Sequence, residues 1–140
     1  QLSKIEAEEG LDNQQTYRDF AERAIGIRTN LLEVIHDAKD RKKKIVCYGA
    51  PAKGNTLLNF CGIGPDSVDY CVERTAFKIG KYTPGMHIPI ISEEDALKHG
   101  APDFYLLLIW NYFDAIMAKE KSYSEKGGKF IVPIPSVRVL

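Results

Sequence analysis

The sequence has no excess of charge of either sign and no long hydrophobic run. Its 140 residues carry 19 Lys and Arg against 19 Asp and Glu, so the formal net charge is zero. A broad nucleic-acid-binding surface needs a positive excess, and we therefore expect no nucleic-acid partner. No apolar run approaches the roughly 20 residues of a membrane helix, and no signal peptide opens the chain, so we expect no membrane partner.

Cysteine and histidine are sparse as well. The three cysteines, Cys47, Cys61 and Cys71, stand in or beside apolar runs and form no C-x-x-C pair. This pattern indicates reduced core thiols, from which we predict a cytoplasmic protein with no disulfide and no metal site. The three histidines are scattered along the chain, and we predict no catalytic residue in it.

The length fits one domain. The chain starts at Gln1, without a methionine and with a helix-like composition, so we expect it to be a piece of a longer protein. Residues 1–15 are polar and acidic and are predicted to be a lead-in from a preceding domain; residues 16–140 are predicted to form one Rossmann-like domain. Within the latter, apolar residues recur at three- and four-residue steps over residues 16–41, which predicts a long amphipathic N-terminal helix.

After that helix, short apolar runs alternate with helical patterns. Strands are predicted at residues 44–48, 68–72, 88–91, 103–109 and 129–132, and helices at residues 55–61, 93–98 and 112–121. Such alternation indicates a parallel sheet with right-handed crossovers. We predict an α/β fold, a Rossmann-like three-layer sandwich with a mostly parallel five-stranded sheet of order 3-2-1-4-5.

A glycine-rich turn follows the first predicted strand. It contains five residues that could surround an anion at the start of the next helix, because backbone N–H groups and the helix dipole point there. These are Gly49, Lys53, Gly54, Asn55 and Thr56. The spacing matches neither a P-loop nor the G-x-G-x-x-G dinucleotide fingerprint. The alternative is that the glycines only permit a tight strand-to-helix turn.

Further candidate ligand residues follow the other strands. Glu73 ends the second strand, where dinucleotide folds place an acid on ribose hydroxyls; the alternative is a solvated charge. Residues 74–91 contain too much glycine and proline for a long helix and combine cations with aromatic rings, which suits an anionic ligand with a flat ring. The residues concerned are Arg74, Lys78, Lys81 and Tyr82. A solvated basic loop is the alternative.

Trp110 and Asn111 end the predicted fourth strand and could stack on a ligand and hydrogen-bond to it. Alternatively, the Trp belongs to the core and the Asn caps the next helix. In open α/β sheets ligands bind outside the carboxyl ends of the strands, where the winding reverses. All the candidate residues are therefore expected around one crevice.

Four stretches carry a resemblance to a known family: YGAPAKGNTLLNFCGI, KIGKYTPGMHIPI, PDFYLLLIWNYFDAI and GGKFIVPIP. In this order they resemble the C-terminal domain of the SAM-dependent sugar C-methyltransferases. The resemblance implies an upstream SAM-binding domain, an upstream zinc-binding domain, and a nucleotide-linked keto-sugar held between the SAM domain and this one. The chain itself has no SAM-binding motif and no zinc cysteine cluster, so it is expected to hold no cofactor.

We therefore predict a substrate-binding domain of a SAM-dependent C-methyltransferase acting on a nucleotide-linked keto-sugar or similar small molecule. The isolated chain is expected to be inactive. Two alternatives remain open at this point. The first is an independent NAD(P)-binding oxidoreductase domain, motivated by Glu73 and the glycine turn, and the second is a structural module that docks through its long first helix.

Overall fold

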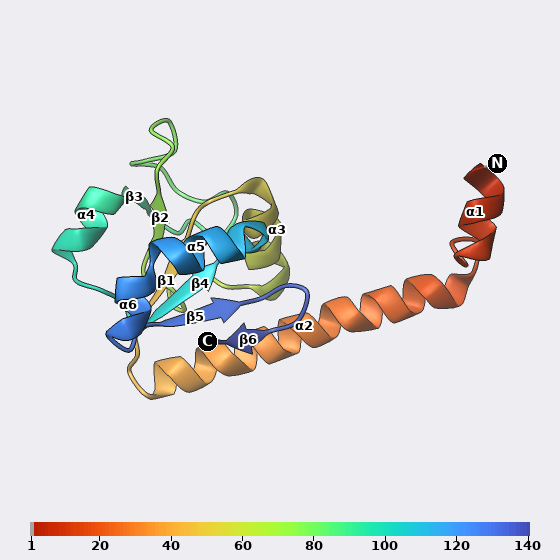
Figure 1. Ribbon diagram of the computed structural model, residues 1–140, viewed down its shortest axis with the longest axis horizontal. Helices are drawn as coiled ribbons and strands as arrows, with labels where there is room; N and C mark the ends of the chain where they lie inside the picture. The colour runs from red at the N-terminus through yellow and green to blue at the C-terminus, as the bar shows by residue number, and fades with distance from the viewer. Residues whose placement is uncertain (1) are drawn as a thin grey trace.

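The computed structural model describes residues 2–140, which form an α/β domain with a long helix extending from it (Figure 1). The helices are α1 (Leu2–Glu8), α2 (Gln14–Asp40), α3 (Ala52–Cys61), α4 (Glu93–Lys98), α5 (Phe113–Lys119) and α6 (Lys121–Glu125), with a 3-10 turn η1 (Trp110–Tyr112). The strands are β1 (Ile45–Tyr48), β2 (Cys71–Glu73), β3 (Ile90–Ser92), β4 (Phe104–Leu107), β5 (Lys129–Val132) and β6 (Arg138–Val139).

The sheet has the order β3-β2-β1-β4-β5-β6. Its first five strands pair in parallel, so the predicted fold class and the order 3-2-1-4-5 are confirmed. The predicted number of strands was wrong, because β6 pairs antiparallel with β5 at one edge. A strand of two residues is too short to produce a periodic pattern, and it follows Pro133 and Pro135, which indicated a stop.

Helices cover both faces of the sheet, as expected when parallel strands are apolar on both sides. On one face, α2 and α3 bury residues such as Leu31, Ile35 and Leu58 against alternate strand residues, including Leu106. On the other face, the short helices α4 and α5 pack on the opposite strand residues, and Leu107, Phe130 and Ile116 form one of two clusters there. The core is therefore two apolar layers separated by the sheet.

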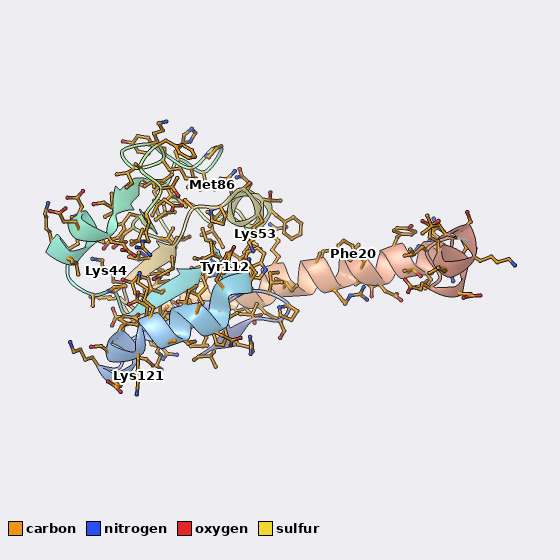
Figure 2. The ribbon with its side chains drawn as sticks, turned by 45° about the horizontal axis from the view of Figure 1, so that its top comes forward. Phe20, Lys44, Lys53, Met86, Tyr112 and Lys121 are labelled. Atoms are coloured by element: carbon orange, nitrogen blue, oxygen red, sulfur yellow. The ribbon has the colours of Figure 1, made fainter. Side chains whose placement is uncertain are left out.

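Only the C-terminal part of α2 belongs to this core. Its buried residues are Leu31, Ile35 and Ala38, whereas Tyr17 and Phe20 nearer its start are 58% and 64% exposed. The helix extends well beyond the sheet (Figure 1), and Phe20 lies on the extended part (Figure 2). The helix over residues 16–41 was predicted from its periodicity, and the structure confirms it with bounds Gln14–Asp40.

The largest local correction concerns the start of α3. The helix begins at Ala52, after an extended Pro51, and not at residue 55 as predicted. Gly54 is consequently a helical residue: a Cβ there would lie 2.6 Å from the Leu108 Cβ, so glycine permits α3 to approach β4. The turn itself depends on Gly49, whose φ of +83° favours glycine.

Candidate functional site

The predicted residues gather at the edge of the sheet where the carboxyl ends of β1, β2 and β4 lie. The strand order reverses between β1 and β4, which is the place where open α/β sheets bind ligands. Helix α3 begins beside it. Its N-cap residue is Pro51, with no side-chain hydrogen bond, and no acidic residue stands in its first turn. The first N–H groups of α3 therefore have no side-chain acceptor, and the positive end of the helix dipole faces this edge.

Lys53 joins two predicted parts of the site. Its ammonium contacts the Asn111 side-chain oxygen and lies 4.4 Å from the centre of the Trp110 ring. Lys53 and the adjacent pair Trp110 and Asn111, which come from two separate stretches of sequence, thus form one cluster (Figure 2 labels Lys53 on α3). We name Lys53, Trp110 and Asn111 the lysine cluster.

Asn111 does not cap the following helix. It lies inside the 3-10 turn η1, and neither η1 nor α5 has a side-chain capping bond. The amide oxygen is used for Lys53 instead, so the capping alternative was wrong. Trp110 is part-buried beside the core. A ring of this kind, with a cation over its face, can hold the lysine and still present its edge to a ligand.

Glu73 anchors the loop that follows it. One carboxylate oxygen accepts bonds from the Arg74 and Thr75 N–H groups at 2.9 and 3.1 Å. The other accepts from the Ala50 N–H at 3.0 Å and contacts the Lys78 ammonium at 3.3 Å. Although burial alone would raise it, these donors lower the pKa of Glu73 to about 2. Both oxygens are engaged within the protein, so the role that the structure shows is loop anchoring; a ribose contact stays a prediction.

The three predicted cations of the loop after Glu73 have different surroundings. Lys78 is the most enclosed: its ammonium donates to the Ala50 carbonyl at 2.9 Å and pairs with Glu73. Arg74 is exposed and lies 3.5 Å from a carboxylate oxygen of Glu93 on α4. Lys81 lies 6.0 Å from the centre of the Phe77 ring. Two of the three are thus matched by an acid, which leaves less positive charge at this edge than the sequence suggested.

The loop is ordered by its own hydrogen bonds. Thr83, a buried polar residue, accepts a bond from the Ile88 N–H at 3.0 Å through its hydroxyl, and its own N–H donates to the Ile88 carbonyl at 2.9 Å. Tyr82 and Pro89 form an isolated antiparallel bridge. A long ordered loop of this kind inside a compact domain is usually functional.

A cavity of about 320 Å³ lies between the start of α3 and this loop. We name it the edge cavity. Its lining residues are Ala50, Pro51, Ala52, Asn55, Phe77, Lys78, Lys81, Tyr82, Pro84 and Ile90. The rings of Phe77 and Tyr82 are 69% and 63% exposed. The side-chain oxygen of Asn55 is sealed from solvent and accepts no hydrogen bond from any residue that the structure describes.

Four of the twelve predicted residues line this cavity: Asn55, Lys78, Lys81 and Tyr82. Three of the other eight have roles within the protein. Thr56 is exposed, and its hydroxyl donates to the Ala52 carbonyl one turn back in its own helix, at 3.3 Å. Gly49 and Gly54 shape the backbone, with Gly49 packed on Ile109 and Gly54 packed on Leu108. Their positions fit the alternative in which the glycines permit a tight turn and a close approach.

A second cavity, also of about 320 Å³, was missed. It lies on the other face of the sheet between α4 and the helices α5 and α6, and we name it the tyrosine cleft after Tyr48, Tyr105 and Tyr123, which line it. Lys119 and Glu93 lie at its rim, and Lys119 also donates to the Tyr48 hydroxyl at 3.0 Å. The signal in the sequence was a tyrosine in each of two predicted central strands, Tyr48 and Tyr105, at positions where aliphatic residues were expected.

Two further findings concern the part of the chain that the structure describes. In residues 2–140, no helix combines the length and apolar character that a membrane crossing requires. In the same residues, no group of three or more His, Cys, Asp and Glu side chains could hold a metal ion.

Comparison with known proteins identifies the family. Residues 1–135 match the family described as C-methyltransferase C-terminal domain. The chain is also 44% identical over 135 residues to a protein named C-methyltransferase NovU from Streptomyces niveus. That match covers 96% of the chain but only 32% of the relative, so the chain spans about a third of the length of that protein. The predicted resemblance is confirmed: the chain belongs to the C-methyltransferase C-terminal domain family.

Proposed function

We propose that this chain is the substrate-binding domain of a SAM-dependent C-methyltransferase that acts on a nucleotide-linked keto-sugar or a similar small molecule. The observation that carries the proposal is the lysine cluster beside the uncapped start of α3. A cation and free helix N–H groups together favour a phosphate. The similarity to a protein named as a C-methyltransferase supports the reaction class, and the resemblance of the four sequence stretches supports the sugar.

In this proposal the chain binds and orients the ligand, and the methyl transfer takes place against an upstream domain of the same cytoplasmic protein. SAM, held upstream, supplies the methyl group. Lys53 and the first N–H groups of α3 neutralise phosphate charge, and the anchored loop after Glu73 limits access of water from one side. Methylation at a ring carbon also needs a base within hydrogen-bond reach of the C–H, and we assign no residue of this chain to that role.

Titration of a thymidine diphosphate sugar into the chain tests the binding role. Amide resonances of residues 49–56 and 74–82 should shift, because they surround the proposed phosphate and loop contacts. Shifts confined to other surfaces would contradict the proposal. Radiolabelled SAM supplied with the same sugar should give no labelled product with this chain alone; labelled sugar would mean that the chemistry lies in this domain.

A second candidate is docking through α2, and a specific observation favours it. The extended half of this helix exposes Tyr17, Phe20 and Ile25, each by more than half. An upstream domain of the same protein is the partner that the resemblance implies. The oxidoreductase alternative has less support, because Glu73, the acid that motivated it, accepts hydrogen bonds from the Ala50 N–H and from two N–H groups of its own loop.

A further inference from the structure

The N-terminal helix α1 is not held by the core of the domain. It is seven residues long, and none of these residues is buried. Isolated helices of this length are unstable in water, because forming the first turn costs more free energy than a few hydrogen bonds return. Its two large apolar side chains, Leu2 and Ile5, are exposed. A short helix of this kind needs a partner that covers it.

The turn between α1 and α2 is determined by its own sequence. Gly10 ends α1 with a φ of +71°, and the Leu11 N–H donates to the Glu6 carbonyl at 2.8 Å. This is a common helix C-cap, and it favours glycine because of the positive φ. Helix α2 begins after Asn13, whose side-chain oxygen accepts from the Gln15 N–H at 2.9 Å. The direction in which α1 leaves α2 therefore follows from local hydrogen bonds.

Two side chains of α2 tie this turn to the helix. The Thr16 hydroxyl donates to the Gly10 carbonyl at 2.7 Å, and the Tyr17 hydroxyl donates to the Leu11 carbonyl at 2.6 Å. The ring of Tyr17 is held in place by its hydroxyl and yet remains mostly exposed. We name residues 2–20, which comprise α1, this turn and the start of α2, the helix corner.

The inside of the helix corner is hollow, and its surroundings are acidic. A cavity of about 390 Å³ lies there, lined by Ser3, Glu6, Ala7, Leu11, Asp12 and Tyr17. Residues 1–22 carry six acids against two bases, although the whole chain has no net charge. Among residues 2–140, none of these six acids forms an ion pair. Such a surface suits a partner that presents an apolar side chain with basic side chains around it.

The apolar stripe of α2 indicates on which side this partner lies. Tyr17 and Ile35 are about five helical turns apart, so they point the same way from α2. Ile35 is buried in the core beside the sheet, so Tyr17 continues the face of α2 that the domain covers. Helix α2 extends in the direction in which the β5 arrow points (Figure 1), and β5 is parallel to β4. A body seated in the helix corner therefore lies beyond the carboxyl ends of the strands.

We propose that the helix corner is the docking surface for the preceding domain of the same protein. This inference rests on the proposed function. The chain matches a C-terminal domain and spans about a third of the length of the relative, so a preceding domain of such a protein connects directly to α1. That domain docks with basic side chains around an apolar one, covers Leu2, Ile5 and Tyr17, and is thereby held beside the edge of the sheet that carries the lysine cluster.

Hydrogen exchange of this chain and of the full-length protein that contains it tests the docking. In the isolated chain, the amides of residues 2–12 should exchange rapidly, because α1 is short and uncovered. In the full-length protein they should exchange at least about tenfold more slowly, whereas the amides of β1, in the core, should not change. Equal rates for residues 2–12 in the two proteins would overturn the proposal.

Charge reversal separates docking from a simple continuation of α1 into the preceding residues. Glu6→Lys combined with Asp12→Lys should return the exchange of residues 2–12 in the full-length protein to within about threefold of the isolated chain, because both acids line the corner cavity. Glu33→Lys, which changes an exposed acid of α2 outside the helix corner, is the matched control and should have no effect. Slow exchange that survives the double reversal would overturn the acidic docking surface.

A pair of glycine variants tests the shape of the helix corner. At Gly10 the positive φ strains an alanine, and its Cβ would lie 3.3 Å from the Thr16 hydroxyl oxygen. Gly10→Ala should therefore speed the exchange of residues 2–12 in the full-length protein at least about threefold. Gly26→Ala, in the same helix, places a Cβ with no atom within 4 Å and should not speed it. Equal effects of the two variants would overturn the corner as the docking element.

Further outcomes concern the occupant and the proposed function. The isolated chain should be a monomer in sedimentation equilibrium; a dimer that the double charge reversal dissociates would make a second copy the occupant and overturn the proposal. Slow exchange in the full-length protein, without binding of a thymidine diphosphate sugar, would support the docking surface and reject the substrate-binding role. Binding of that sugar together with rapid exchange of residues 2–12 would support that role and overturn the docking surface.

Discussion

The edge cavity and the tyrosine cleft have the same volume, about 320 Å³, and both are rich in aromatic residues. They differ in what the rings touch. In the tyrosine cleft, the Tyr105 ring lies 5.2 Å from that of Tyr48 and 4.7 Å from that of Tyr123, centre to centre. In the edge cavity, Phe77 and Tyr82 are mostly exposed. The rings of the cleft are thus used for packing, and those of the edge cavity remain open to a ligand.

The polar groups of the two cavities also differ, in whether they have hydrogen-bond partners. In the tyrosine cleft, the Tyr48 hydroxyl donates to Glu120 at 2.8 Å, and the Tyr123 hydroxyl lies 3.1 Å from each of two backbone carbonyl oxygens. In the edge cavity, the Asn55 oxygen has no donor among the described residues. The comparison indicates that volume and aromatic content do not identify a ligand site. Polar groups that lack a hydrogen-bond partner within the protein identify such a site better.

Alanine at Tyr123 and at Tyr82 should give opposite results, and this is the largest difference that we predict. Tyr123 packs on Tyr105 and Phe130, and its ring lies against Gly128, where a Cβ would come within 2.2 Å of it. Tyr123→Ala should therefore lower the free energy of unfolding by about 3 kcal/mol, measured by urea denaturation. Nucleotide affinity at a temperature where the variant is folded should stay unchanged.

Tyr82→Ala is the matched variant in the edge cavity. Because the side chain is 63% exposed, its loss should change the free energy of unfolding by less than about 0.5 kcal/mol. Loss of a stacking ring should instead weaken nucleotide binding by about 1–3 kcal/mol. If both variants lost stability equally, the distinction between the two cavities would be wrong.

Glu73, which anchors the loop beside the edge cavity, should make the free energy of unfolding depend on pH. The pKa of Glu73 is about 2 in the folded chain and about 4.3 in an unfolded one. A carboxylate whose pKa is lower in the folded chain than in the unfolded one stabilises the fold. This contribution is fully present above the pKa of the unfolded chain and is lost as the pH falls towards 2. At roughly 1.4 kcal/mol for each pKa unit, the carboxylate contributes about 2–3 kcal/mol at neutral pH, and Glu73→Gln should remove most of it.

Urea denaturation between pH 7 and pH 2.5 measures this contribution. The wild type should lose stability in the acid range faster than Glu73→Gln does. Glu125→Gln serves as the control, because its side chain is 64% exposed and lies 3.8 Å from its Lys121 partner; the expected change is below about 0.5 kcal/mol. Parallel pH curves for the wild type and Glu73→Gln would show that Glu73 is not the titrating anchor.

The sheet could be predicted from the sequence because its central strands are near-continuous apolar runs. Their order followed from the rules for right-handed crossovers. The start of α3 could not be predicted, because Pro51 and Gly54 together indicate a turn. Only the approach of Leu108, far along the chain, explains why a glycine stands inside the helix.

The site was predicted in outline for a similar reason. Topology brings the carboxyl ends of β1, β2 and β4 together, so Lys53, Trp110 and Asn111 could be placed near one another without knowing their contacts. Which partner each polar group chooses depends on short distances that sequence spacing does not determine. Glu73 bonds to its own loop, and Asn55 remains unpaired, for that reason.

Lys53→Ala tests the phosphate end of the proposed ligand. The side chain is half-buried against Asn111 and the Trp110 ring, so the free energy of unfolding should fall slightly, and a charge-assisted hydrogen bond to the phosphate of about 1.5–3 kcal/mol should be lost. Affinity for a nucleotide diphosphate should fall roughly tenfold to a hundredfold, measured by calorimetry. Lys121→Ala, an exposed lysine on α6 with 79% of its side chain accessible, is the control. Unchanged affinity in Lys53→Ala would place the phosphate elsewhere.

The smallest predicted difference lies within the tyrosine cleft itself. The pKa of Tyr48 is raised, first by burial and then by Glu120 against the opposing effect of Lys119, so its hydroxyl stays protonated and can donate to Glu120. Tyr48→Phe removes that bond and the acceptor of the Lys119 ammonium, and should cost about 1 kcal/mol of unfolding free energy.

The Tyr105 hydroxyl is half-buried on the neighbouring strand, and its pKa is raised to about 12, mainly by burial. Among residues 2–140 it has no such pair of charged hydrogen-bond partners, so Tyr105→Phe should stay within about 0.5 kcal/mol of the wild type. Urea denaturation of the two variants side by side resolves the difference. A larger loss in Tyr105→Phe than in Tyr48→Phe would mean that the cleft holds an unsatisfied group of its own, and the contrast with the edge cavity would no longer hold.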